Sequence, residues 1–233
     1  MWKVLILCYL GVATAFKSLI IKPGGTKGYY MMGMCKYIKD HYDLSDWHFY
    51  GSSAGAWNAL YLSCKKENEN EFMQQTQELG QFSYRDLYDL EKTMKKRLLT
   101  HFTIDDFDVS KLHICVTRQR KGCFYFEKNV IHEFQDLDDI LECCIASSHL
   151  PFLSNGKFSY TYRNEECVDG GFYNKPYTKM DNVTPNIILR PNMWENPNID
   201  ELDSIYSLDI FKLLYHGYND AYQNREFFDE HFR

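Results

Sequence analysis

The sequence predicts an α/β fold with a largely parallel central sheet. Short apolar runs typical of buried strands alternate with stretches of helical periodicity, and two of the strand-to-helix transitions pass through glycines. Parallel strands need a crossover connection, usually a helix, so this alternation is typical of a parallel sheet. The 233 residues suffice for one large core, and we expect a single domain over residues 16–233.

The chain begins with two successive strand, turn, helix units. Each unit starts with a short apolar run that stops at glycine and continues into a run of helix-forming residues. The expected strands are residues 18–21 and 47–50, and the expected helices are residues 28–41 and 54–64. The polar segment over residues 65–103, with scattered Phe, Tyr and Leu, predicts one or two surface helices.

The second half of the chain predicts fewer and shorter elements. Apolar runs at residues 112–116 and 123–126 flank a basic turn, which indicates a hairpin. The pattern over residues 137–147 predicts a helix that ends before Pro151. A short strand is expected over residues 186–189. We interpret the apolar stripe of the C-terminal helix as core packing. Its members are Leu208, Phe211, Leu214, Tyr215, Tyr218 and Tyr222.

The charge balance excludes a nucleic-acid-binding role. Lys and Arg total 26 against 32 Asp and Glu, a formal net charge of −6, so the chain lacks the basic surface that a polyanion requires. Aromatic residues make up 16% of the chain, which suits a large core and an apolar substrate pocket equally well.

The N-terminus has the three parts of a secretory signal peptide. A basic start at Lys3 is followed by an apolar run over residues 4–13 and by small residues up to Ala15, so residues 1–15 are expected to be cleaved before Phe16. This places the protein in the secretory pathway, and the glycosylation pattern at Asn182 supports secretion weakly. The alternatives are a buried first strand, or an uncleaved apolar anchor on a membrane or lipid droplet, because the run is too short to span a bilayer.

The cysteines predict free thiols and no metal site. Removal of Cys8 with the leader leaves seven of the eight cysteines, an odd number that cannot pair completely. The remaining ones lie mostly in apolar context, without a CxxC pair or a Cys/His cluster at zinc spacing. They are Cys35, Cys64, Cys115, Cys123, Cys143, Cys144 and Cys167.

Ser53 is the candidate nucleophile. Residues 51–55 fit the pattern G-x-S-x-G and lie where a strand gives way to a helix, the context of a nucleophile elbow. Gly51 and Gly55 permit a turn too tight for neighbouring side chains, which leaves Ser53 above the sheet. The amino end of the following helix favours negative charge at this position.

Two further glycine motifs complete the candidate site. The loop over residues 23–28 opens the first helix and can supply backbone N–H donors for an oxyanion. Pro23 has no N–H, so the donors are expected among Gly24, Gly25 and Thr26, ahead of Gly28. The loop lacks the spacing of a phosphate-binding or dinucleotide-binding motif. Later in the chain Asp169 supplies a carboxylate, and Gly170 and Gly171 after it allow close approach of another backbone segment.

These three motifs, in this order, resemble the patatin-like phospholipase family over residues 18–176. The resemblance implies a three-layer α/β/α sandwich with a largely parallel central sheet, completed by the C-terminal strand and helix up to residue 233. It implies a Ser/Asp dyad hydrolase of lipid acyl esters, with Ser53 as nucleophile and Asp169 as proton acceptor. The glycine loop forms the oxyanion hole, an acyl-enzyme is the intermediate, and neither a metal nor an organic cofactor is implied.

The resemblance also suggests a branch and a substrate class. Residues 50–56, 116–118 and 143–152 look most like the animal branch that includes adipose triglyceride lipase and adiponutrin. The implied partner is a lipid substrate, phospholipid or acylglycerol, at a membrane or lipid-droplet interface, and no protein partner is implied. Two positions depart from the family pattern: Pro23 replaces the first loop glycine, and Lys27 stands where many members carry Arg.

The sequence is also compatible with two other functions. Ser53, Asp169 and His216 follow the chain order of a conventional α/β-hydrolase triad, although His216 lies in the C-terminal helical segment, where a structural histidine is the commoner case. The third possibility is a lipid-binding module that kept the fold without catalysis. A dyad needs Asp169 to act as a base despite an ordinary pKa near 3.9, so a dry pocket must raise that pKa.

Overall fold

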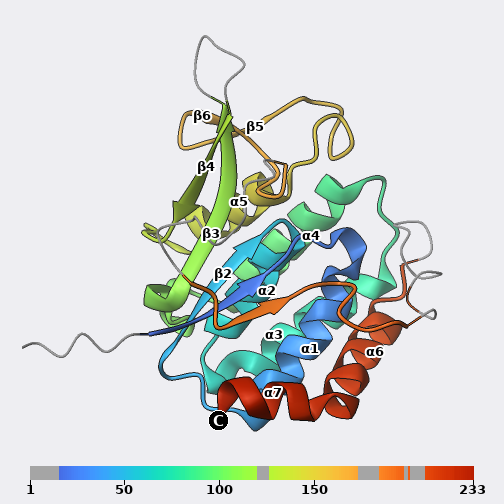
Figure 1. Cartoon of the computed structure of the whole chain (residues 1–233). Helices are drawn as coiled ribbons and strands as arrows, with labels where there is room; N and C mark the ends of the chain where they lie inside the picture. Colours follow the sequence, from blue (N-terminus) through green and yellow to red (C-terminus); the bar gives the residue numbers. More distant parts are fainter. Residues whose placement is uncertain (1–15, 120–125, 173–183, 197–198, 200–207) are drawn as a thin grey trace, which may run out of the picture.

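The computed structural model describes residues 16–119, 126–172, 184–196, 199 and 208–233. The described strands form one sheet in the order β5-β6-β3-β2-β1-β7, and β4 also pairs with β3 (Figure 1). The four strands β3, β2, β1 and β7 lie side by side and run parallel to one another. Both β4 and β6 pair antiparallel with β3, and β5 pairs antiparallel with β6. The strands are β1 (Lys17–Ile21), β2 (Trp47–Ser52), β3 (Leu112–Gln119), β4 (Phe126–Ile131), β5 (Tyr160–Tyr162), β6 (Glu165–Val168) and β7 (Ile187–Leu189).

Helices flank this sheet and connect its parallel strands. The α/β class with a mostly parallel central sheet is therefore confirmed. The α-helices are α1 (Gly28–His41), α2 (Ala54–Ser63), α3 (Glu69–Glu78), α4 (Leu87–His101), α5 (Leu137–Ser148), α6 (Ile210–Gln223) and α7 (Arg225–Phe232). None of the helices in the described part of the chain is long and apolar enough to cross a bilayer.

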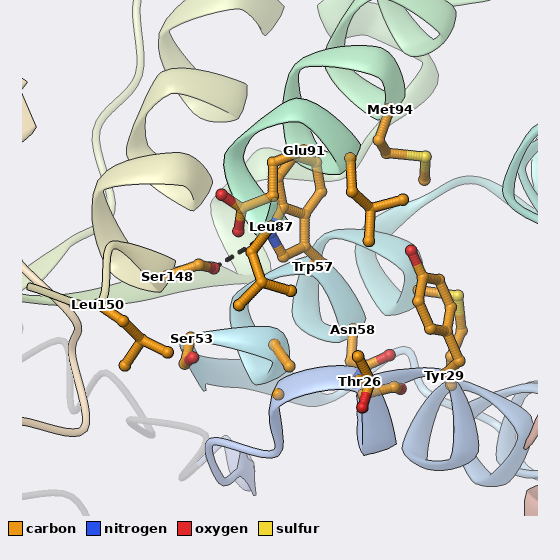
Figure 2. A pocket seen from close by; sticks show the side chains of 15 residues that line it. Thr26, Tyr29, Ser53, Trp57, Asn58, Leu87, Glu91, Met94, Ser148 and Leu150 are labelled. Atoms are coloured by element: carbon orange, nitrogen blue, oxygen red, sulfur yellow. Dashed lines mark hydrogen bonds between the residues drawn. The ribbon is translucent and has the colours of Figure 1, made fainter. Parts of the chain in front are cut away.

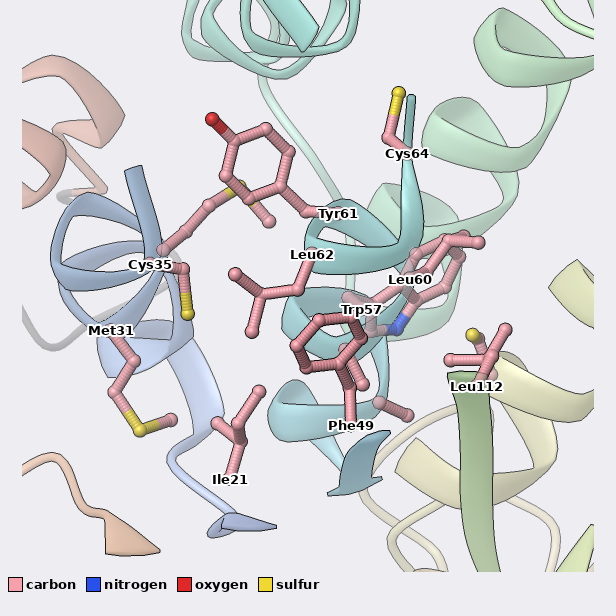
Figure 3. Packing of buried hydrophobic residues seen from close by; sticks show 14 of the residues in the cluster. Ile21, Met31, Cys35, Phe49, Trp57, Leu60, Tyr61, Leu62, Cys64 and Leu112 are labelled. Atoms are coloured by element: carbon pink, nitrogen blue, oxygen red, sulfur yellow. The ribbon is translucent and has the colours of Figure 1, made fainter. Parts of the chain in front are cut away.

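The main core lies between the sheet and α1, α2 and α5. Ile21, Phe49 and Leu112 come from three adjacent strands and are at most 1% exposed (Figure 3). They pack against side chains of the first two helices within one cluster. A second, smaller cluster of Ile20 and Tyr50, with others, lies apart from it. Alternate residues of β1 and β2 belong to the two clusters, as expected for strands with both faces buried.

The C-terminal helix packs differently from the predicted stripe. In α6 the residues Phe211, Tyr215 and Tyr222 are more than half exposed. The prediction of core packing is confirmed for Leu214, which is buried, and for Leu208 and Tyr218, which pack partly buried against the core. The buried face also contains Leu213 and Gly217, because a Cβ at Gly217 would lie only 1.8 Å from a carbonyl oxygen of α1. The close backbone approach of the two helices thus sets the rotation of α6, and the spacing of its large side chains does not.

Other predicted elements differ at their edges. The strand predicted over residues 47–50 continues through Ser52, whereas the segment over residues 65–103 forms two helices, α3 and α4, which agrees with the predicted number. The hairpin of β5 and β6, joined by Arg163 and Asn164 at φ values of 48° and 62°, was not predicted, because its strands are short and polar. The second strand of the predicted hairpin is described only from Phe126 onwards.

The six described cysteines are buried and form no disulfide bond, as predicted for them. Cys8 and Cys123, the leader over residues 1–15 and the glycosylation pattern at Asn182 lie outside the described residues.

Candidate active site

Ser53 occupies the single-residue turn between β2 and α2. Its backbone has φ of 55° and ψ of −132°, which residues other than glycine rarely adopt. A Cβ on Gly51 would lie 2.1 Å from the Gly55 carbonyl oxygen, and a Cβ on Gly55 would lie 2.2 Å from the Ile21 carbonyl oxygen. Both glycines are therefore required for the turn, and it leaves Ser53 at the amino end of α2, where the helix dipole favours negative charge.

Asp169 directly follows β6, in a loop that is fixed to the end of α5. The Asp169 N–H donates to the His149 carbonyl oxygen at 2.8 Å, and the Gly170 N–H donates to the Ser147 carbonyl oxygen at 2.8 Å. A Cβ on Gly170 would lie 2.1 Å from the Cys115 carbonyl oxygen. Only glycine fits at this position, which explains the first glycine of the Asp-Gly-Gly motif.

Ser147 connects the serine turn to the aspartate loop. Its side-chain oxygen accepts from the Ser53 N–H at 2.9 Å and donates to the Cys115 carbonyl oxygen at 2.6 Å. Its own carbonyl oxygen accepts from Gly170. Ser147 is fully buried, and this positioning role was not predicted from the sequence. A serine inside an otherwise apolar stretch of α5 was the available signal, because a buried hydroxyl needs hydrogen-bond partners.

The Asp169 side chain faces Ser53 and is only 3% exposed. One carboxyl oxygen, Oδ1, accepts from the Gly171 N–H at 2.6 Å. The other, Oδ2, is buried and makes no hydrogen bond of standard geometry. The pair is therefore close enough to interact, and Oδ2 retains the capacity to accept a proton.

Burial is the main influence on the pKa of Asp169. It raises this pKa because the charged form loses its hydration, while the Ser53 hydroxyl, the Gly171 N–H and the Lys128 ammonium lower it by less. The net pKa lies above the usual range of an aspartate. This is the direction that makes a carboxylate a better proton acceptor near neutral pH. Lys128, on β4, was not predicted to act near the site.

The glycine loop after β1 reaches the same place. Gly25, Thr26 and Gly28 line a cavity together with Ser53, whereas Gly24 does not line it. Gly25 has φ of 53° at the start of the 3-10 turn η1 (Gly25–Lys27), a conformation that favours glycine. Of the three predicted N–H donors, Gly25 and Thr26 thus line the cavity, whereas Gly24 precedes them in the chain and does not.

Close contacts hold the three motifs together. A Cβ on Gly28 would lie 2.6 Å from the Ala54 Cβ, and a Cβ on Gly171 would lie 2.4 Å from the Pro23 Cγ. The glycine loop therefore packs against the start of α2 on one side and against the Asp-Gly-Gly loop on the other. The structure brings together all three segments that were predicted to form the site.

The cavity above Ser53 is mainly apolar (Figure 2). The cavity has a volume of about 80 Å³, and its walls come from α1, α2, α4 and the end of α5. The contribution of α4 was not predicted, since its segment was expected to lie at the surface. The apolar lining residues are Tyr29, Met32, Ala54, Trp57, Leu87, Leu90, Met94 and Leu150.

No histidine lines this cavity within the described part of the chain. His216 lies on α6, which packs against α1. His149 is next to the aspartate loop, but its Nε2 is 3.2 Å from the Lys157 carbonyl oxygen. The geometry thus places Asp169, and neither histidine, beside Ser53. Over the same ranges, no group of three or more His, Cys, Asp or Glu side chains is arranged to hold a metal ion.

Comparisons with known proteins identify the family. A model of patatin-like phospholipases matches residues 19–180. VipD from Legionella pneumophila has a similar structure at 14% identity and a TM-score of 0.38, covering 80% of this chain and 52% of VipD. The ExoU–SpcU complex of the Pseudomonas aeruginosa type III secretion system matches at 12% identity and a TM-score of 0.36, covering 88% of this chain and 52% of the matched one. The chain thus spans about half the length of these structures.

Among curated protein sequences, none matches the chain. The family model spans more than half of the chain and includes the glycine loop, Ser53 and Asp169. The chain belongs to the patatin-like phospholipase family.

Proposed function

We propose that the protein is a serine acyl hydrolase that cleaves the carboxylic esters of phospholipids or acylglycerols and releases fatty acid. The observation that carries this proposal is the placement of Ser53, in its strained turn, beside the buried and unpartnered Oδ2 of Asp169, at the base of an apolar cavity. Membership of the patatin-like phospholipase family supports lipid esters as the substrate class.

In the proposed mechanism Asp169 acts first as base and then as acid. The Ser53 oxygen attacks the ester carbonyl carbon while its proton passes to Asp169. Backbone N–H groups of Gly25 and Thr26, with Gly24 beside them, stabilise the oxyanion. The bond to the alcohol then breaks as Asp169 returns the proton to the leaving oxygen. Water attacks the acyl-enzyme and gives a proton to Asp169, which passes it to the Ser53 oxygen as the bond to the acyl carbon breaks and the fatty acid leaves.

A ridge of exposed apolar side chains beside the site suits a lipid surface. Phe152, Leu153 and Phe172 are 64%, 73% and 51% exposed. Phe172 is linked to Phe152 through Phe126 and Phe158, with ring centroids 5.7 to 6.2 Å apart. The ridge starts one residue after Gly171 of the aspartate loop. Such a surface can insert its side chains into a lipid interface next to the cavity.

We expect fatty acid release from phosphatidylcholine vesicles or triacylglycerol emulsions, and a dependence of this release on the apolar ridge. The double variant Phe152→Asn, Leu153→Ser should lower hydrolysis of vesicles on the order of 10²-fold, because each buried apolar side chain contributes roughly 1.5–3 kcal/mol and the two together at least about 3 kcal/mol. Asparagine suits the positive φ of residue 152. Hydrolysis of a soluble p-nitrophenyl butyrate should stay within about twofold, since neither side chain lines the cavity.

Phe211→Ser on α6 is the matched control, with a phenylalanine of 52% exposure outside the ridge. It should leave both activities unchanged. An equal loss on vesicles and on the soluble ester would contradict the surface role. Release of fatty acid from none of these substrates would favour a catalytically silent lipid-binding module.

We further propose that the protein enters the secretory pathway and loses residues 1–15. The basic, apolar and small-residue parts of this segment support cleavage before Phe16. Expression in a eukaryotic secretory host should yield a chain that begins at Phe16 by mass analysis. Intact Met1 on a membrane or lipid-droplet fraction that salt does not strip would support the anchor instead. The finer resemblance to the animal branch of the family stays a prediction.

A further inference from the structure

Glu91 is a carboxyl group inside an otherwise apolar part of the cavity. It lies on α4, where Leu87, Leu90, Glu91 and Met94 follow one another at the i, i+3, i+4, i+7 spacing of a single helix face. All four line the cavity that holds Ser53, and Figure 2 shows Leu87, Glu91 and Met94 there. The carboxyl group therefore occupies a position where this pattern predicts an apolar side chain.

The Glu91 carboxyl lacks a full set of partners. Its Oε2 atom is buried and makes no hydrogen bond of standard geometry. The Trp57 indole N–H and the Ser148 hydroxyl face the carboxyl group as hydrogen-bond donors, and each of them also has a second acceptor nearby. Trp57 Nε1 donates to Ser148 Oγ at 3.2 Å, and Ser148 Oγ donates to the Cys144 carbonyl oxygen at 3.0 Å.

The protonated, neutral form of Glu91 is favoured at pH 7. Burial raises its pKa to about 8, although Ser148 and Trp57 lower it, and the charge of Asp169 raises it further. A neutral carboxyl group has one O–H donor and acceptor oxygens. It can therefore exchange hydrogen bonds with a hydroxyl group, which is also both donor and acceptor. A plain hydrocarbon chain can satisfy neither capacity, and an unsatisfied buried polar atom destabilises the complex.

We propose that Glu91, together with Trp57 and Ser148, forms a polar subsite in the cavity that binds a hydroxyl group of the lipid substrate. This inference rests on the proposed lipid hydrolase function and deepens it. The hydroxyl comes either from a hydroxylated acyl chain or from the alcohol part of the ester, as in a monoacylglycerol. Either way the subsite selects among lipid esters by a buried hydrogen bond, the kind of contact that discriminates more strongly than an added methylene.

Two pairs of esters distinguish these sources. The first compares p-nitrophenyl dodecanoate with a series of its monohydroxylated isomers, so that only the acyl chain changes. The second compares 1-octanoylglycerol with propyl octanoate, so that only the alcohol changes. The wild-type protein should prefer the hydroxylated member of one pair by about tenfold in kcat/KM. Glu91→Met should remove this preference, and Glu91→Gln should keep most of it.

Met94→Leu is the control on the same face of α4, and it should change both members of a pair by the same factor. Thermal unfolding of each variant reports on the fold, and a buried carboxyl replaced by methionine should not lower the melting temperature. Equal hydroxyl preference in the wild-type protein and in Glu91→Met, or no preference in either pair, would overturn the proposal.

Calorimetry separates this inference from the proposed function. Each ligand is titrated into the protein. The affinity of free hydroxydodecanoic acids is compared with that of dodecanoic acid, and the affinity of 1-O-octylglycerol with that of octyl propyl ether. If the wild-type protein binds a hydroxylated ligand more tightly than Glu91→Met does, the subsite is supported even when no ester is hydrolysed. The absence of hydrolysis would then contradict only the proposed hydrolase function. Equal binding of both members overturns the subsite whether or not esters are hydrolysed.

Discussion

Replacement of Ser53 by alanine should lower kcat/KM for ester hydrolysis on the order of 10⁴-fold or more, because the nucleophile is lost and with it the acyl-enzyme pathway. The side chain is 7% exposed and packs in a turn whose backbone hydrogen bond to Ser147 uses the main-chain N–H, which alanine retains. The fold should therefore be preserved. Initial rates on p-nitrophenyl butyrate and thermal unfolding measure the two effects.

The adjacent Ser52→Ala is the matched control. Ser52 is fully buried at the end of β2 and does not line the cavity. Its replacement should change stability more than turnover. Wild-type turnover by Ser53→Ala, or an equal loss in both serine variants, would show that Ser53 is not the nucleophile.

Replacement of Asp169 by asparagine should lower kcat/KM on the order of 10³-fold or more, since an amide cannot accept the Ser53 proton. The N–H of Gly171 can still donate to the amide oxygen, so the loop should keep its position. In the wild-type protein kcat/KM should rise with pH as Asp169 loses its proton. The midpoint should lie above the usual range of an aspartate, because burial raises the pKa of this group. The asparagine variant should lack this acidic limb.

His216→Ala is the control that separates the dyad from a triad. His216 lies on α6 outside the cavity, so its loss should alter kcat/KM by less than about threefold. A loss on the order of 10³-fold in His216→Ala at unchanged thermal stability would restore the conventional triad. An acidic limb that persists in Asp169→Asn would assign the base to another group.

The local parts of the site could be predicted because their chemistry is written in short motifs. The Ser53 turn needs glycine two residues before and two residues after the serine, since a Cβ added at Gly51 or at Gly55 would lie only about 2 Å from a backbone oxygen. Such requirements restrict residue type strongly, so G-x-S-x-G between a strand and a helix indicates the turn. The same holds for Gly170 against the Cys115 carbonyl oxygen.

Residues that reach the site through tertiary packing could not be predicted in this way. Ser147 and Lys128 are far from Ser53 in sequence, and only the pairing of β3 with β4 and the packing of α5 bring them close. The sequence does contain a signal for Glu91, because this carboxylate interrupts the apolar stripe of α4. The polar character of the surrounding segment nevertheless indicated a surface helix. The rotation of α6 likewise depends on Gly217, whose contact partner lies on another helix.

The central claim is that Asp169 activates Ser53 for covalent catalysis, and labelling with a fluorophosphonate tests it most directly. At pH 7 the wild-type protein should gain one phosphonyl adduct, mapped by peptide mass analysis to Ser53. Asp169→Asn should label on the order of 10²-fold more slowly, and His216→Ala at the wild-type rate. An adduct on a different residue, or equal labelling rates in the wild-type and Asp169→Asn proteins, would contradict this account.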